Sequence, residues 1–137
     1  MKCNREFILA YNRLFEFLTK NDSIDEFWPL LTDAILGRLK FLVKTKGIAG
    51  MIEYWSDTLL AEGADCTLIA NFNEHNSFEI IMRDCPSLRI LSESKEPCHG
   101  YCSHCDEIYS LCLKELGYSF ESIGTTGGCV IRIKELK

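Results

Sequence analysis

The chain has 137 residues, of which 47% are hydrophobic and 26% are charged, and its formal net charge is −5. These values are typical of one folded domain and exclude a disordered tail, a collagen-like fibre and a coiled coil. An acidic chain without a basic cluster is a poor partner for nucleic acid, and no apolar run approaches the ~18 residues of a membrane span. The first ten residues lack an apolar secretory core, so we expect a cytoplasmic protein with neither nucleic acid nor membrane as a partner.

The first part of the chain, residues 1–63, has the pattern of a helical half. Its apolar residues recur every three or four positions, which is the spacing of one face of a helix. Trp28 and Trp55 fall on these apolar stripes, and we assign both to the core. The pattern predicts three helices, near residues 4–20, 24–45 and 48–62.

The second part, residues 64–137, has a different period. Apolar residues alternate with mainly polar ones before and after a single helical stretch, which indicates strands on either side of a helix. The predicted order is ββαββ, with strands near 66–73, 77–84, 118–123 and 128–134 and a helix near 102–116. We therefore expect one domain of class α+β, in which helices cover one face of a four-stranded antiparallel sheet.

Cysteine is the outlier of the composition, with eight residues in the chain. Without an export signal these thiols are expected to be reduced. Five cysteine and histidine residues lie within eight positions, and histidine does not usually cluster in apolar cores. This density predicts a functional segment, which comprises Cys98, His99, Cys102, His104 and Cys105.

One interpretation of this segment is a metal site. Cys102 and Cys105 have the spacing that commonly chelates zinc, and Cys98 is a third candidate ligand. A closed zinc site needs a further pair, and no second C-x-x-C motif is present. The three cysteines also have the spacing found in radical-SAM iron–sulfur enzymes, but here the motif begins a late helix in a much shorter chain. Zinc is the favoured metal, and an iron–sulfur cluster the less favoured one.

A second interpretation is a nucleophilic thiol. Cys102 is expected near the N-terminus of the last helix, where unpaired backbone N–H groups favour a thiolate. His104 and His99 are close in sequence, and an imidazole beside a cysteine is a common way to activate it. Cys112, in contrast, belongs to the apolar stripe of the same helix, and we assign it to the core.

Two further cysteines lie at strand ends, where sites are often built. Cys85 ends a strand and precedes Pro86, which favours an extended backbone. Cys129 begins the last strand after a Gly-Gly turn, where glycine permits a close approach of backbone or ligand. We expect the thiols of Cys85, Cys102 and Cys129 to converge, with Cys105 or Cys98 near them. Tyr101 could donate a hydrogen bond to a ligand there.

The region from Cys85 to Ile133 resembles the L-2-amino-thiazoline-4-carboxylate hydrolase-like family. The order of elements is also similar to that of the ligand-binding domains related to vinyl-reductase proteins. The motifs that carry the first resemblance are Cys85-Pro86, Tyr101-Cys102-Ser103-His104-Cys105, Leu116-Gly117-Tyr118 and Gly127-Gly128-Cys129. The family name implies opening of a cyclic thiazoline by hydrolysis of a C–N bond.

Two hypotheses for the function follow. The first is a cysteine-dependent hydrolase of a small polar, sulfur-containing cyclic molecule, with catalytic residues Cys102, His104 and Cys85, and with Cys129, Tyr101 and His99 binding the substrate. The second is a domain without catalysis that binds a small ligand or a metal such as zinc through the same thiols. The partner is a small molecule in both, and a homodimer stays open in both.

Overall fold

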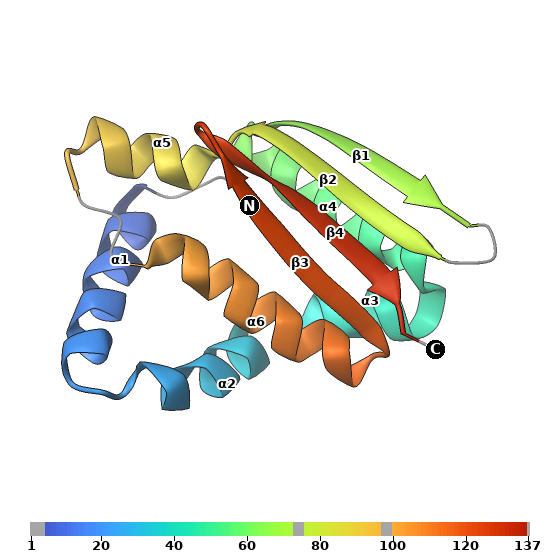
Figure 1. The fold of residues 1–137 in the computed structure, drawn as a ribbon, viewed down its shortest axis with the longest axis horizontal. Helices are drawn as coiled ribbons and strands as arrows, with labels where there is room; N and C mark the ends of the chain where they lie inside the picture. Colours follow the sequence, from blue (N-terminus) through green and yellow to red (C-terminus); the bar gives the residue numbers. More distant parts are fainter. Residues whose placement is uncertain (1–4, 73–75, 97–99, 137) are drawn as a thin grey trace.

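The computed structural model describes residues 5–72, 76–96 and 100–136. The described residues form six helices and four strands (Figure 1). The helices are α1 (Arg5–Lys20), α2 (Ile24–Ile35), α3 (Gly37–Lys46), α4 (Ile48–Glu62), α5 (Pro86–Glu93) and α6 (Tyr101–Glu115). The strands are β1 (Asp65–Asn71), β2 (Ser77–Asp84), β3 (Tyr118–Thr125) and β4 (Gly128–Glu135).

The four strands make one sheet in the order β1-β2-β4-β3, and every neighbouring pair is antiparallel. The two hairpins, β1–β2 and β3–β4, therefore meet through their second strands. Ile80 of β2 pairs with Ile131 of β4, and Ile131 pairs with Ser122 of β3. This register places Cys129 of β4 opposite Met82 on one side and Gly124 on the other.

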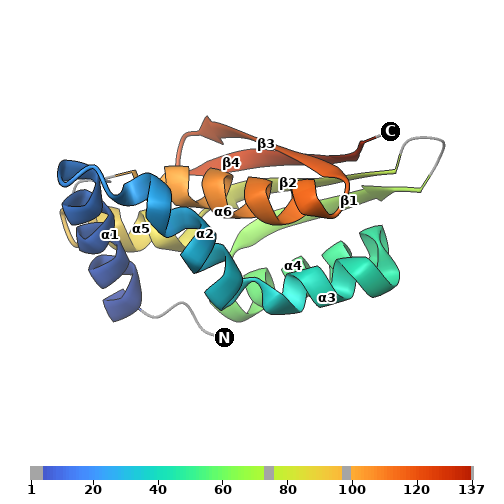
Figure 2. The same cartoon turned by 90° about the horizontal axis from the view of Figure 1, so that it is seen from below.

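The helices cover one face of the sheet, as Figure 2 shows for α3, α4 and α6. Helix α4 packs against β1 and β2, and α6 packs against β3. Helix α1 contacts α2, α5 and α6 at the side of this layer. The predicted α+β class, with N-terminal helices and a four-stranded antiparallel sheet, is confirmed. No described helix combines the length and apolarity needed to cross a membrane.

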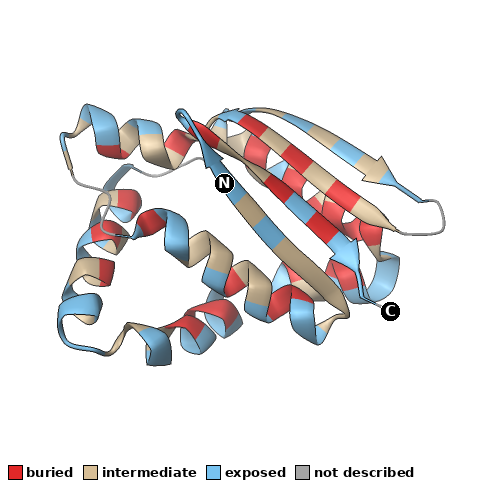
Figure 3. Ribbon diagram, in the orientation of Figure 1, coloured by how far each residue is buried: buried red, intermediate tan, exposed pale blue. Residues whose placement is uncertain are grey.

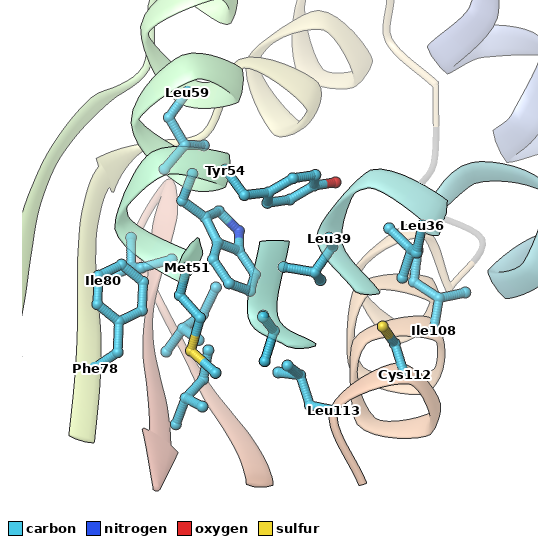
Figure 4. Close-up of a cluster of buried hydrophobic side chains, with 14 of the residues drawn as sticks. Leu36, Leu39, Met51, Tyr54, Leu59, Phe78, Ile80, Ile108, Cys112 and Leu113 are labelled. Carbon is cyan, nitrogen blue, oxygen red and sulfur yellow. The ribbon is translucent and has the colours of Figure 1, made fainter. Parts of the chain in front are cut away.

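The core lies between the sheet and the helices. Alternate residues of β2 and β4 face it, so buried positions alternate with half-buried ones along β2 and with half-buried or exposed ones along much of β4 (Figure 3). Trp28 and Trp55 are buried, as predicted. Cys112 has no exposed surface and packs in the cluster with Ile108 and Leu113 (Figure 4). The assignment of Cys112 to the core is confirmed.

The predicted helix at 24–45 is in fact two helices that meet at Leu36. Leu36 leaves helical geometry, with φ −105° and ψ 17°, and its side chain is 1% exposed. Ile35, which a continuous stripe would bury, is 46% exposed. The bend turns Leu36 into the core instead, and Gly37, a poor interior helix residue, allows the break there. Helix α5 is a further difference, because its eight residues give too short a pattern to predict.

Candidate functional site

Three chain segments that are distant in sequence meet at one end of the sheet. They are the end of β2, the turn between β3 and β4, and the first turns of α6 (Figure 1). The backbone N–H of Cys85 donates a 2.9 Å hydrogen bond to the carbonyl of Gly127, which ties the first segment to the second. Ser122 of β3 donates a hydrogen bond to the carboxylate of Asp106, which ties the second segment to α6.

Cys85 is placed by the transition from β2 to α5. Its backbone is extended, with φ −88° and ψ 116°, and Pro86 begins α5, so the effect expected of the proline is confirmed. The backbone N–H groups of Ser87 and Leu88, in the first turn of α5, favour the thiolate of Cys85, although its side chain makes no capping hydrogen bond there. Burial nevertheless raises the pKa of Cys85 above its ordinary value, because it outweighs the effect of these N–H groups. Cys85 is therefore a protonated thiol at neutral pH.

Cys105 lies near three other cysteines. Burial raises its pKa well above the ordinary value, and the neighbouring thiols of Cys85, Cys102 and Cys129 raise it further. The hydrogen bonds from Cys85 to Gly127 and from Ser122 to Asp106 tie the same three chain segments together, in agreement with these neighbours of Cys105. The structure thus brings together cysteines from the end of β2, the start of β4 and the first turns of α6.

Cys129 lies between Met82 and Gly124 in the sheet. Burial, followed by the proximity of Cys85 and Asp106, raises its pKa to about 11. We call Cys85, Cys105 and Cys129 the thiol cluster. All three side chains are half-buried, whereas Cys102 is exposed on the first turn of α6, at the edge of this cluster.

The imidazole of His104 is held by aromatic rings and by the backbone. Its ring stacks on Phe15 of α1, with 5.1 Å between the centroids, and meets Tyr101 edge-on at 4.4 Å. Its Nδ1 contacts the carbonyl oxygen of Tyr101. Burial lowers its pKa, so the ring is neutral at pH 7.

His104 also contacts Cys105, but without the geometry of a base beside a nucleophile. The Sγ atom lies 3.9 Å from Nδ1 and 3.8 Å from Nε2. A sulfur that is almost equally distant from both nitrogens is not aligned with the lone pair of either one. The predicted role of His104 as an acid or base toward Cys102 stays a prediction.

Tyr101 lies in the core more than in the site. Tyr101 is 8% exposed, and the centroid of its ring lies 5.9 Å from that of Phe15. Its predicted role in ligand binding stays a prediction. Cys98 and His99 lie outside the described residues.

The described residues contain no complete set of metal-binding side chains. Within residues 5–72, 76–96 and 100–136, no group of three or more Cys, His, Asp or Glu side chains is arranged to hold a metal ion. The predicted set of Cys98, Cys102 and Cys105 includes a residue outside these ranges, so this set and its zinc ion stay predictions.

Sequence reasoning missed several polar residues around the thiol cluster. Asp106 follows Cys105 in α6, and its carboxylate raises the pKa of Cys105 and Cys129. Tyr109 lies one turn further on, where its hydroxyl hydrogen-bonds that of Tyr54 from α4. Glu62, the last residue of α4, raises the pKa of Cys85 and Tyr109 and is half-buried. Asp106 directly follows the cysteine motif in the sequence, and this position is the signal that could have identified it.

Gly124 leaves room next to Cys129. A Cβ atom built on Gly124 would meet no atom within 4 Å. Gly124 lies opposite Cys129 in the register, and alternation puts it in line with Phe120 and Ser122, whose side chains contact α6 through Tyr109 and Asp106. The position beside Cys129 on this face of β3 is therefore open and exposed.

Comparison of the chain with protein-family models, with curated proteins and with solved structures gives no match.

Proposed function

We propose that the protein is a binding domain that holds a small polar, sulfur-containing cyclic molecule at the thiol cluster without converting it. The observation that carries the proposal is the proximity of Cys85, Cys105 and Cys129 at the end of the sheet where Gly124 leaves an open position. Small-ligand sites place a few convergent polar groups among apolar side chains.

The protonation state of the cluster supports binding over catalysis. The thiolate is the nucleophilic form of cysteine, and raised pKa values keep all three thiols protonated at neutral pH. Protonated thiols can pack against a ligand and donate weak hydrogen bonds to it. The unaligned contact between His104 and Cys105 also supports this choice.

A hydrolase remains the second candidate because of one observation. Cys102 is exposed in the first turn of α6, and an accessible thiol at a helix N-terminus is a common form of nucleophile. In that case Cys102 would attack a ligand held at the thiol cluster. The resemblance to the thiazoline-carboxylate hydrolase-like family favours the same chemistry.

Titration with 2-aminothiazoline-4-carboxylate, followed by NMR of the backbone amides, tests the proposal. We expect saturable shifts at Cys85, Cys105, Cys129 and Gly124, and recovery of the intact probe. Gly124→Val should abolish these shifts, because the new side chain occupies the open position. Thr125→Val is the matched control, since it introduces the same residue at the next position, on the other face of β3.

Two results would overturn the proposal. Unperturbed amides at the thiol cluster with millimolar probe would show that it is not the binding site for this class of molecule. Accumulation of the ring-opened product, lost in Cys102→Ser, would identify a hydrolase instead of a binding domain.

A further inference from the structure

The thiol cluster lies in an environment of negative charge. Glu62, Asp84 and Asp106 are charged groups that raise the pKa values of thiols in this cluster. The described cysteines elsewhere differ, since Arg83 acts on Cys66 and Lys40 on Cys112.

Asp106 is the carboxylate that geometry places best for contact with a ligand. It follows Cys105 in α6 and is half-buried. The hydroxyl of Ser122 donates a hydrogen bond to its Oδ1. Ser122 belongs to β3 and faces the same side as Gly124, two residues further along the strand. The carboxylate is thus fixed on the helix side of the sheet, near the open position beside Cys129.

Asp106 has acceptor capacity beyond this hydrogen bond. An ionised carboxylate has two oxygens and about four acceptor positions, of which Ser122 uses one. Among the ion pairs of the described residues, none involves Asp106. The basic residues closest in sequence to Cys85 are Arg83 and Arg89, which form ion pairs with Asp65 and Asp84, respectively.

We propose that Asp106 selects ligands with a cationic nitrogen group, such as an amidinium or isothiouronium, and that Ser122 positions its carboxylate. The inference rests on the proposed function, because it takes the thiol cluster as the binding site. The N–H donors of the ligand would bind Asp106 while its sulfur or apolar part would lie on the thiols and over Gly124. A ligand whose only charge is a carboxylate would be repelled by Asp106 and Glu62.

Two probes that share one ring test this charge selection. 2-Amino-2-thiazoline is an isothiouronium cation at neutral pH, and 2-methyl-2-thiazoline presents the same ring without the amino group and is largely uncharged. A hydrogen bond to a charged group contributes more than a neutral one, so we expect the cation to bind at least about tenfold more tightly. Calorimetry, or NMR where binding is weak, gives the ratio of the two dissociation constants.

Variants in α6 and β3 test whether Asp106 causes this difference between the two dissociation constants. Asp106→Asn should reduce it to within about twofold of unity, because the amide keeps a hydrogen-bonding shape but loses the charge. Glu107→Gln is the matched control, since it removes one charge from the adjacent exposed position of the same helix, and the ratio should stay at its wild-type value. Ser122→Ala should lower the ratio, and Ser122→Thr, which retains a hydroxyl, should restore it.

The outcomes separate the two proposals. If both probes bind equally to the wild-type protein, and Gly124→Val abolishes both, charge selection is wrong and the thiol site stands. If neither probe binds, the thiol site and the charge selection are both wrong. A ratio that persists in Asp106→Asn, in a variant whose melting temperature matches the wild type, would also overturn the role of Asp106.

Discussion

Gly128→Ala should destabilise the protein strongly, because β4 approaches β2 closely just before Cys129. A Cβ atom at Gly128 would lie 1.9 Å from the carbonyl oxygen of Met82, whereas real Cβ contacts are essentially never below 3.0 Å. The strands would have to separate by about an ångström. Overpacking against side chains costs about 1–3 kcal/mol, and a backbone carbonyl yields less easily, so we expect a loss of about 3 kcal/mol. For a chain of this size this loss lowers the melting temperature by about 10 °C.

Gly124→Ala is the matched control in the same hairpin. Its Cβ would meet nothing within 4 Å, and alanine restricts the unfolded chain, so its melting temperature should be unchanged or slightly higher. Thermal unfolding followed by circular dichroism measures both variants. Equal melting temperatures for Gly128→Ala and Gly124→Ala would refute the close approach of β4 to β2 as described, and with it the position of Cys129.

Three further predictions concern buried and exposed side chains. Tyr54→Phe and Tyr109→Phe should each cost about 1 kcal/mol or more in urea unfolding, because each leaves the hydroxyl of the other tyrosine without its partner. The double variant should cost less than the sum of the two, and additive costs would refute the hydrogen bond between them. An alkylating reagent at pH 7 should label exposed Cys102 well before Cys112, which has no exposed surface and a pKa of about 11, as peptide mass mapping would show; the reverse order would contradict the burial of Cys112. His104 has a lowered pKa, so the unfolded chain binds its proton more readily, and stability should fall as pH drops below about 6.5. The fall between pH 7 and 5.5 should be smaller in His104→Gln, and an equal fall would refute the burial of a neutral imidazole.

The fold could be predicted from the sequence because its signals are local. The alternation in β2 and β4 follows directly from one buried face, and the strands lie within two residues of their predicted bounds. The break at Leu36 could not be predicted, because it depends on which side chain the core accepts after the helices pack. A leucine at position 36 is compatible with a continuous apolar stripe or with a bend, and only the tertiary contacts determine which of the two forms.

The candidate site could be predicted only in part. Cys85 and Cys129 follow from strand ends, which local patterns locate. Asp106 and Glu62 could not be identified in the same way, because surface carboxylates are common and their proximity to thiols depends on how α4 and α6 pack. The raised pKa values of the thiols are likewise a tertiary effect of burial, which no spacing of cysteines in the sequence expresses.

Bridging of the thiol cluster by phenylarsine oxide tests the central claim most directly. This reagent forms two As–S bonds with a pair of neighbouring thiols and releases water. The variant with Cys98→Ser and Cys102→Ser removes the other cysteines of the motif that could form such a pair with Cys105. We predict that this variant retains one arsenical per chain, and that peptide mass mapping finds the bridge between two members of the thiol cluster. A chain that retains no arsenical, or a bridge to any cysteine outside the cluster, would contradict the convergence on which the proposed site depends.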